Sequence, residues 1–471
     1  MSAAPLLVIG LDCLTPQLVF GAWRDELPTF RRLTRVGLWG RLQSTVPPIT
    51  VPAWSAMLTG RDPGELGFYG FRNRADYSYE HMRVADATAV REPRVWDRVG
   101  AAGRPVIVVG VPQTYPPPAV NGVLVSCFLT PNTQGQYTYP PELKAEIEGL
   151  FGDYMLDVED FRTEDKAGLL QRIRAMSMQR FRVVRHLLRT RPWDFAMFVD
   201  MGPDRIHHGF WKYFDPGHPK YQPGSPYAGA IRDFYRLLDE QVGALLAEVG
   251  RETTVVIMSD HGAQAMEGGL AVNEWLRREG YLAVREPLPG GLVPLSKVQI
   301  DWEHTVAWGA GGYYGRIFLN VQGREPQGTI PPERYEAVRD ELAARLEAMP
   351  GPGGRPLGTR VFKPEAIYAR CGHVPPDLIV YFGNLAWRSV GSLGLGSIYT
   401  FENDTGPDDA NHGPEGIFIL YDPRRREGRE LRGMSYLDVA PTLLDLLDLP
   451  VPAELRGKSV VAAGREAAGR K

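Results

Sequence analysis

The segment Thr254–Gly262 reads TVVIMSDHG, a run of apolar and β-branched residues that ends in Asp-His-Gly. Such a run, followed at once by polar turn residues, is typical of a strand buried on both faces of a sheet. Comparable runs occur at Leu6–Leu11, Pro105–Val109, Val123–Phe128, Phe195–Val199, Ile317–Asn320, Leu378–Phe382 and Ile417–Leu420. Helical repeats lie between them, at Leu169–Leu188, Ala228–Val249 and Tyr335–Met349. This alternation predicts an α/β fold with a mainly parallel sheet covered by helices on both faces.

Acidic residues and a histidine recur at the carboxyl ends of the predicted strands. They are Asp12 after Leu6–Leu11, Asp200 and Asp204 after Phe195–Val199, and Asp260 with His261 after Thr254–Met258. Ligands of open α/β sheets bind at that edge. We therefore expect these side chains to meet in one site.

Composition gives limits on partners and compartment. The 471 residues carry a formal net charge of −3, which gives no electrostatic reason to expect nucleic acid as a general partner. No apolar stretch approaches the ~20 residues needed to cross a bilayer. The isolated cysteines Cys13, Cys127 and Cys371 favour a reducing compartment, so a cytoplasmic location is predicted. Oligomeric state has no sequence signal.

The length suggests more than one domain, or one large α/β domain with a substantial insertion. Loose segments rich in Gly and Pro, at Pro287–Pro294 and Pro350–Gly358, fall inside residues 262–372. We interpret that region as a cap inserted between two parts of a catalytic core, residues 1–261 and 373–464. Residues 465–471 are predicted to be a disordered tail.

Several carboxylates and imidazoles have metal-ligand spacing. Asp204 and His208 stand four residues apart and would share one face of a helix, although His207 is an alternative to His208. Singly, Asp204 could stabilise a helix start, and Asp260-His261 could form an ordinary turn. Together with Asp12 and His412 they form a set suited to Zn²⁺, or to Mn²⁺ and Fe²⁺ with less preference.

A nucleophile is offered by Thr50, which ends the Pro-constrained segment Thr45–Thr50 and precedes a helix predicted to start near Pro52. A hydroxyl at that position gains from the helix dipole, and a bound metal would lower its pKa. Thr50 could also be only the helix N-cap, and both roles can hold at once.

The order Asp12, Thr50-Val51-Pro52, Asp204-x-x-x-His208, Asp260-His261-Gly262, His412 resembles the alkaline phosphatase superfamily, and within it the type I phosphodiesterase/nucleotide pyrophosphatase group. The segments Thr50–Gly60 and Tyr436–Ser459 resemble that group's nucleophile helix and closing helix. Gly323–Gly328 is similar to a less characterised bacterial and archaeal subgroup. The resemblance implies an alkaline-phosphatase-like core with two divalent metal ions, zinc first and manganese second. It places Asp12, Thr50, Asp260 and His261 around one ion, and Asp204, His208 and His412 around the other.

The resemblance also implies an activity, hydrolysis of a small phosphoester through a phosphothreonine intermediate on Thr50, with diesters as the favoured substrates. Sulfatases of this superfamily carry Cys or Ser in a Cys/Ser-x-Pro-x-Arg motif, whereas this chain has Thr50-Val51-Pro52-Ala53-Trp54. A sulfatase is therefore not expected. The alternatives are a phosphomonoesterase, a phosphotransferase or phosphomutase, and a non-catalytic protein stabilised by its metals.

Substrate contacts are less well defined. The related pyrophosphatases have Asn-Asn beyond the nucleophile helix, and Arg72-Asn73 stands there in this chain. Arg72 or Asn73 could contact phosphate, or Arg72 could be a charge on a surface loop. Other residues are kept off the ligand set: Asp200 as structural, His218 and His304 for want of a partner, and Trp302, Trp308 and Tyr313 as either pocket lining or core.

Overall fold

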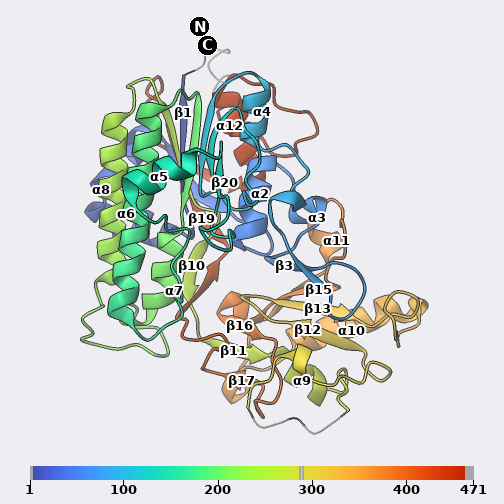
Figure 1. The fold of residues 1–471 in the computed structure, drawn as a ribbon. Coiled ribbons are helices and arrows are strands. Elements are labelled where there is room, and N and C mark those ends of the chain that lie inside the picture. The colour runs from blue at the N-terminus through green and yellow to red at the C-terminus, as the bar shows by residue number, and fades with distance from the viewer. Residues whose placement is uncertain (1–3, 286–287, 289–290, 462–471) are drawn as a thin grey trace.

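The computed structural model describes residues 4–285, 288 and 291–461. A nine-stranded sheet runs through the larger part of the molecule (Figure 1). Its strand order is β20 (Arg429–Ser435), β2 (Leu38–Gln43), β19 (Glu415–Tyr421), β9 (Thr254–Met258), β1 (Leu6–Leu11), β8 (Phe195–Asp200), β5 (Val106–Val109), β6 (Gly122–Val125) and β7 (Thr138–Tyr139). Only β19 and β7 run against the others. The predicted fold class, mainly parallel with covered faces, is confirmed.

Helices cover both faces of this sheet (Figure 1). One layer holds α1 (Pro28–Val36), α5 (Leu143–Phe151), α6 (Lys166–Thr190), α7 (Gly202–Phe214) and α8 (Ala230–Glu248). The other holds α2 (Thr50–Thr59), α4 (Val95–Ala101) and α12 (Val439–Leu446), with the short α3 (Pro63–Leu66) beside it. Every residue of β1, β8 and β9 is buried, which explains their uninterrupted apolar sequences.

A second unit lies below the core in Figure 1. Its larger sheet has the order β12 (Ala307–Ala310), β13 (Gly315–Leu319), β15 (Leu378–Tyr381), β14 (Arg360–Phe362), and its smaller one β16 (Trp387–Val390), β11 (Gly268–Ala271), β17 (Tyr399–Thr400). Helices α9 (Val272–Arg278), α10 (Tyr335–Glu347) and α11 (Pro364–Ile367) accompany these sheets. This cap has its own apolar core, which runs from Leu270 to Leu393.

The chain enters and leaves the cap through a two-stranded ribbon. β10 (Gly262–Ala265) leads out of the core, and β18 (Ala410–Gly413) returns antiparallel to it. On this basis we propose that the cap spans residues 266–409, beyond the boundary at Gly372 that the sequence suggested. The run Leu378–Phe382 lies outside the predicted cap and was expected in the core sheet, but β15 pairs antiparallel with β13 in the cap. An apolar run has the same appearance in either sheet.

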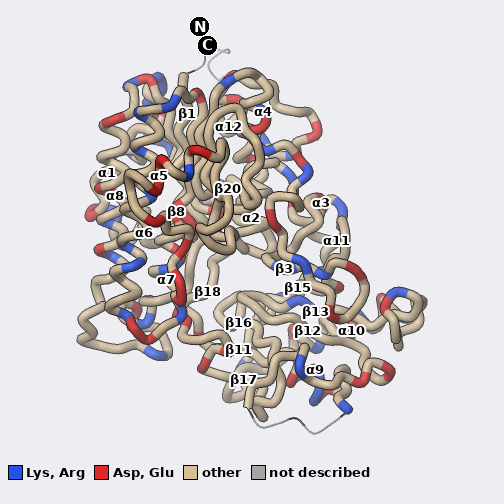
Figure 2. Tube along the Cα trace, viewed as in Figure 1, with Lys and Arg blue, Asp and Glu red and all other residues tan. Residues whose placement is uncertain are grey.

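A hairpin of the core reaches towards the cap. It is formed by β3 (Arg72–Arg74) and β4 (Met82–Val84). Acidic and basic residues are interspersed over both units (Figure 2). Among the described helices, none combines the length and the apolar character that a membrane span requires. The predicted tail, residues 465–471, lies outside the described residues.

Candidate metal centre

Adjacent parallel strands deliver the predicted carboxylates to one edge of the core sheet. Asp12 follows β1, Asp260 follows β9, and Asp204 lies in the first turn of α7 after β8. Because β9, β1 and β8 are neighbours, their carboxyl ends place these three aspartates together, as expected of an open α/β sheet. All three are buried.

The ribbon at the base of the cap adds a second histidine to His261. In the β10–β18 register His412 stands opposite Ala263, two residues after His261. The imidazole rings of His261 and His412 stack with centroids 3.8 Å apart. A residue close to the end of the chain is thus held against the end of β9.

Two groups of ligand atoms result. In the first, His261 Nε2 lies 3.2 Å from Asp260 Oδ2 and 3.8 Å from Asp12 Oδ1. In the second, Asp204 Oδ1 lies 3.3 Å from His208 Nε2 and 3.5 Å from His412 Nε2. The ligand atoms of Asp204, His261 and His412 also lie within 4.8 Å of one another, so His261 stands between the two groups.

Each of these six side chains has one polar atom fixed by the protein. The fixing contacts are Asp12 Oδ2 with Trp54 Nε1 at 2.8 Å, Asp260 Oδ1 with the Cys13 amide at 3.2 Å, Asp204 Oδ2 with Arg205 Nη1 at 2.5 Å, His261 Nδ1 with Gly262 O at 3.1 Å, His208 Nδ1 with Asp408 Oδ1 at 2.7 Å and His412 Nδ1 with Pro48 O at 2.8 Å. Imidazole Nδ1–H groups that donate to oxygen leave Nε2 as an unprotonated ligand atom. This arrangement is typical of metal sites.

Trp54 reaches Asp12 because Gly10 has no side chain. A Cβ at Gly10 would lie 2.6 Å from the Trp54 ring and 2.7 Å from a Val199 methyl group. Any larger residue in this strand would therefore displace the indole that orients Asp12.

Four of the remaining ligand atoms have no hydrogen-bond partner, although they are enclosed. Asp12 Oδ1, Asp204 Oδ1, Asp260 Oδ2 and His208 Nε2 are buried without a hydrogen bond. An unsatisfied buried polar group costs about 1–3 kcal/mol, and more when it is charged. Since these atoms all point into the two groups, bound divalent cations would satisfy them, and the residues present fit such ions.

The electrostatics lead to the same conclusion. Burial, together with the neighbouring Asp260 and Asp204 carboxylates, raises the pKa of Asp12 well above its ordinary value. Burial also raises the pKa of Asp260 and lowers the pKa of His261. The carboxylates therefore gain from any nearby cation, while the neutral imidazole is the form that binds metal.

Thr50 lies beside the first group. Its Oγ1 is 3.3 Å from His261 Nε2, and only 2% of the residue is exposed. Helix α2 begins at Thr50 itself, two residues before the predicted start at Pro52, and Ile49 occupies the N-cap position without a side-chain hydrogen bond. The Thr50 hydroxyl is thus directed towards the metal-ligand set at the positive end of the helix.

His207 and Asp200 make contacts outside the site. His207 Nε2 is 2.9 Å from the Tyr235 hydroxyl. Asp200 accepts a hydrogen bond of 2.7 Å from Ser177 Oγ. The geometry therefore favours His208 over His207, as the spacing suggested, and gives Asp200 a packing role.

Asp408 was missed by the sequence reasoning. Its side chain is fully enclosed and bonds His208 Nδ1, Arg162 Nε at 3.0 Å and the Tyr313 hydroxyl at 3.3 Å. The Tyr313 ring stacks on His208 and His412, with centroids 4.9 Å and 4.4 Å apart. The sequence signal for Asp408 is weak, because it consists only of a position four residues before His412.

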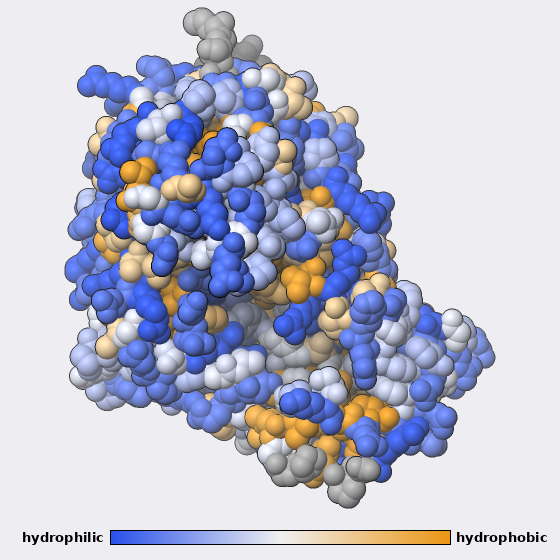
Figure 3. Space-filling model, in the orientation of Figure 1, coloured by the Kyte–Doolittle hydropathy of each residue, from blue (hydrophilic) through white to orange (hydrophobic). Residues whose placement is uncertain are grey.

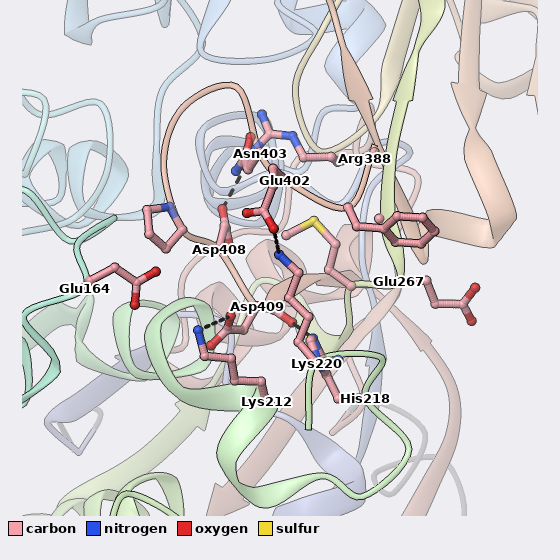
Figure 4. Close-up of a pocket in the computed structure, with 15 residues that line it drawn as sticks. Glu164, Lys212, His218, Lys220, Glu267, Arg388, Glu402, Asn403, Asp408 and Asp409 are labelled. Carbon is pink, nitrogen blue, oxygen red and sulfur yellow. Dashed lines mark hydrogen bonds and ion pairs between the residues drawn. The ribbon is translucent and has the colours of Figure 1, made fainter. Parts of the chain in front are cut away.

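Asp408 also borders a small cavity of about 40 Å³, between the end of α7 and the cap (Figure 4). Lys212 pairs there with Asp409 at 3.4 Å, and His218 Nε2 donates to the Asp409 backbone carbonyl at 3.0 Å. His218 is therefore a packing residue beside the site. His304 is exposed and pairs with Asp301.

The two predicted substrate contacts differ in their surroundings. Both ends of the Asn73 amide are used within its own loop, by the Tyr69 amide at 2.7 Å and by Gly70 O at 2.9 Å. Asn73 therefore shapes the loop. The Arg72 side chain is exposed and pairs with no carboxylate of the described residues, so it is the one available to a ligand.

Comparisons with known proteins come from sequence and structure. The family model described as type I phosphodiesterase/nucleotide pyrophosphatase matches residues 6–408. No curated protein matches the sequence significantly. Similar solved structures include human ectonucleotide pyrophosphatase/phosphodiesterase 5, with 13% identity, TM-score 0.56 and coverage of 98% of this chain and 99% of that one. An inactive threonine-to-alanine variant of the murine protein bound to AMP has 14% identity, TM-score 0.57 and the same coverage. Phosphonoacetate hydrolase from Sinorhizobium meliloti in complex with phosphonoformate has 16% identity, TM-score 0.59 and coverage of 95% and 96%.

Removing the Asp408 carboxylate should weaken metal binding. We expect Asp408→Asn to lower the affinity of the group that contains His208 by about 10- to 100-fold, because the charge that orients and polarises the imidazole is lost. Titration of metal-free protein with Zn²⁺ measures this. Asp301→Asn is a matched control, since Asp301 binds His304 Nδ1 at the surface over a similar 2.8 Å. Equal affinities for the two variants would contradict the assignment.

Substitutions of the adjacent histidines His207 and His208 should have different effects on metal content and stability. His208→Gln should lose one metal ion, whereas His207→Gln should keep the metal content and lose about 1–3 kcal/mol of stability with its hydrogen bond to Tyr235.

Burial lowers the pKa of His207 to about 3 from an ordinary 6.5, so the contribution of His207 to stability is present above pH 6.5 and is lost as the pH falls towards 3. His207→Gln should accordingly lose stability less steeply on acidification. Urea unfolding at several pH values tests this, and loss of a metal ion from His207→Gln would reverse the assignment.

Proposed function

This chain belongs to the type I phosphodiesterase/nucleotide pyrophosphatase family, and we propose that it is a two-metal hydrolase that cleaves phosphodiesters with Thr50 as nucleophile. The proposal rests chiefly on one observation. The Thr50 hydroxyl, at the start of α2, lies 3.3 Å from a histidine that joins two groups of buried, unpartnered ligand atoms.

The chain's own residues define the reaction. Thr50 Oγ attacks phosphorus and loses its proton, while the bond between phosphorus and the leaving oxygen breaks on the opposite side. The resulting phosphothreonine is then hydrolysed by water, which restores the hydroxyl. The N-terminus of α2 favours the negative charge that develops next to Thr50.

Two divalent ions would be held by Asp12, Asp260, His261 and Thr50, and by Asp204, His208 and His412. When bound, such a pair stabilises the charge on both the entering and the departing oxygen. We propose zinc, with manganese as the alternative, because mixed carboxylate and imidazole ligands suit both.

Three features support related parts of the proposal. The murine relative is inactive as a threonine-to-alanine variant and was determined with AMP, which is consistent with a threonine nucleophile and a phosphoester ligand. Arg72 is exposed near the cap and is proposed to contact an anionic part of the substrate. The free cysteines Cys13 and Cys127 are consistent with the proposed cytoplasmic location.

Thr50→Ala should lower the turnover of bis-p-nitrophenyl phosphate by about a thousandfold or more, because no other hydroxyl occupies this position. Metal content should be almost unchanged, since the carboxylate and imidazole ligands remain. Wild-type protein should turn over the diester well above p-nitrophenyl phosphate. Release of p-nitrophenol measures both activities.

Thr59→Ala is the matched control, because Thr59 lies at the other end of the same helix and donates to Ser55 O. It should retain wild-type turnover. Full activity of Thr50→Ala would exclude the nucleophile. A preference for the monoester would favour a phosphatase, and turnover only with an added acceptor would favour a transferase.

A further inference from the structure

A cavity of about 540 Å³ lies between the β3–β4 hairpin and the cap. Its lining comes from the hairpin, from residues 294–302, from β12 with the glycines that follow it, and from residues 388–405. Sites for small organic ligands measure roughly 300–1,000 Å³. The surface of the molecule is hollowed where core and cap meet, and apolar side chains gather on the cap in this view (Figure 3).

Aromatic rings form one side of the cavity. Tyr79 and Trp302 stack face to face with centroids 3.7 Å apart. Trp308 stands edge-on to both, at 5.5 Å and 5.1 Å. Indole and phenol faces bind flat apolar groups through offset or edge-to-face contacts. The wall therefore favours a planar ring over a strongly hydrated ligand.

The walls are fixed relative to each other. Arg74 of the hairpin pairs with Glu325 of the cap at 3.1 Å, and both side chains are almost fully enclosed. The Tyr79 hydroxyl donates to Asn320 Oδ1 at 2.8 Å. Arg324 in turn binds Asp377 through both of its terminal nitrogens. The Gly323–Gly328 motif thus contributes to the contacts that hold the hairpin on the cap. Because these contacts are made within the protein, the cavity is formed before a ligand binds.

The cavity adjoins the metal centre. Gly312, which lines it, directly precedes the Tyr313 that stacks on His208 and His412. Arg388 also lines it, and its Nη1 lies 3.9 Å from Asp408 Oδ2. Arg388 is 5% exposed, and its Nε has no hydrogen-bond partner. Arg388 thus places a cationic guanidinium beside the aromatic wall, and its charge favours a ligand oxygen there.

We propose that this cavity binds the organic group of the phosphoester, and that this group contains a flat, mainly apolar ring with an oxygen that accepts from Arg388. The inference rests on the proposed function, because the metal centre must hold the phosphoryl end of the same molecule. It assigns substrate selection to Tyr79, Trp302 and Trp308 of this chain.

Two phosphonates that share a headgroup test the inference on metal-loaded protein. Isothermal titration with naphthylmethylphosphonate and with methylphosphonate gives two dissociation constants. Burial of the ring should make the naphthyl compound bind at least about tenfold more tightly. Trp308→Ala removes one wall, and Ser296→Trp fills the cavity from an exposed position on its rim. Both variants should reduce the ring's advantage to about twofold or less, while the affinity for methylphosphonate stays within about twofold.

Phe401→Ala is the control, because Phe401 is an exposed aromatic residue of the cap that is not part of this cavity. It should keep the full advantage of the ring. Equal affinities of wild-type protein for the two phosphonates would overturn the inference, as would an unchanged advantage in a folded Ser296→Trp variant. If bis-p-nitrophenyl phosphate is not hydrolysed, the proposed function fails. The ring's advantage, and its loss in the variants, would still decide whether the cavity binds this class of ligand.

Discussion

The mutual repulsion of three buried carboxylates is the constraint on which the site depends. Asp12, Asp204 and Asp260 reach one edge of the sheet because β1, β8 and β9 are neighbours, and each of them is at most 2% exposed. Carboxylates enclosed in this way are costly unless positive charge compensates them. Among these three aspartates Arg205 pairs with Asp204 alone, so the oxygens of Asp12 and Asp260 that face the site have no ion pair with an Arg or Lys of the described residues. Bound metal ions would resolve this imbalance.

The β10–β18 ribbon makes the cap part of the same arrangement. It closes the insertion and brings His412 against His261, so a change in ribbon register would remove a proposed ligand. Next to the ribbon, Asp408 fixes His208, and the cap residue Tyr313 stacks on His208 and His412. The unit proposed to select the organic group of the substrate thus also orients ligands of the proposed second metal ion. The buried ion pair between Arg74 and Glu325, which joins the core hairpin to the cap, is consistent with this coupling.

The sequence predicted those site residues whose position follows from a local pattern along the chain. Polar residues directly after buried strands identified Asp12, Asp204, Asp260 and His261, and helical spacing favoured His208 over His207, which contacts Tyr235 instead. Contacts set by tertiary pairing were not predictable from local pattern, although the family resemblance had implied His412 as a ligand. The approach of His412 to His261 depends on an antiparallel register, and Asp408 is only one of many acidic residues until the fold places it on His208. Likewise, the run Leu378–Phe382 does not reveal which sheet it joins, and only the antiparallel pairing of β15 with β13 places it in the proposed cap.

The central claim is that this edge of the sheet binds two divalent ions. It is tested most directly by metal analysis after reconstitution. Protein stripped with a chelator, supplied with Zn²⁺ and then desalted should retain about two ions per chain by mass spectrometry, and Asp204→Asn should retain about one. Retention of no metal by a wild-type protein that remains folded and equally stable would contradict the account.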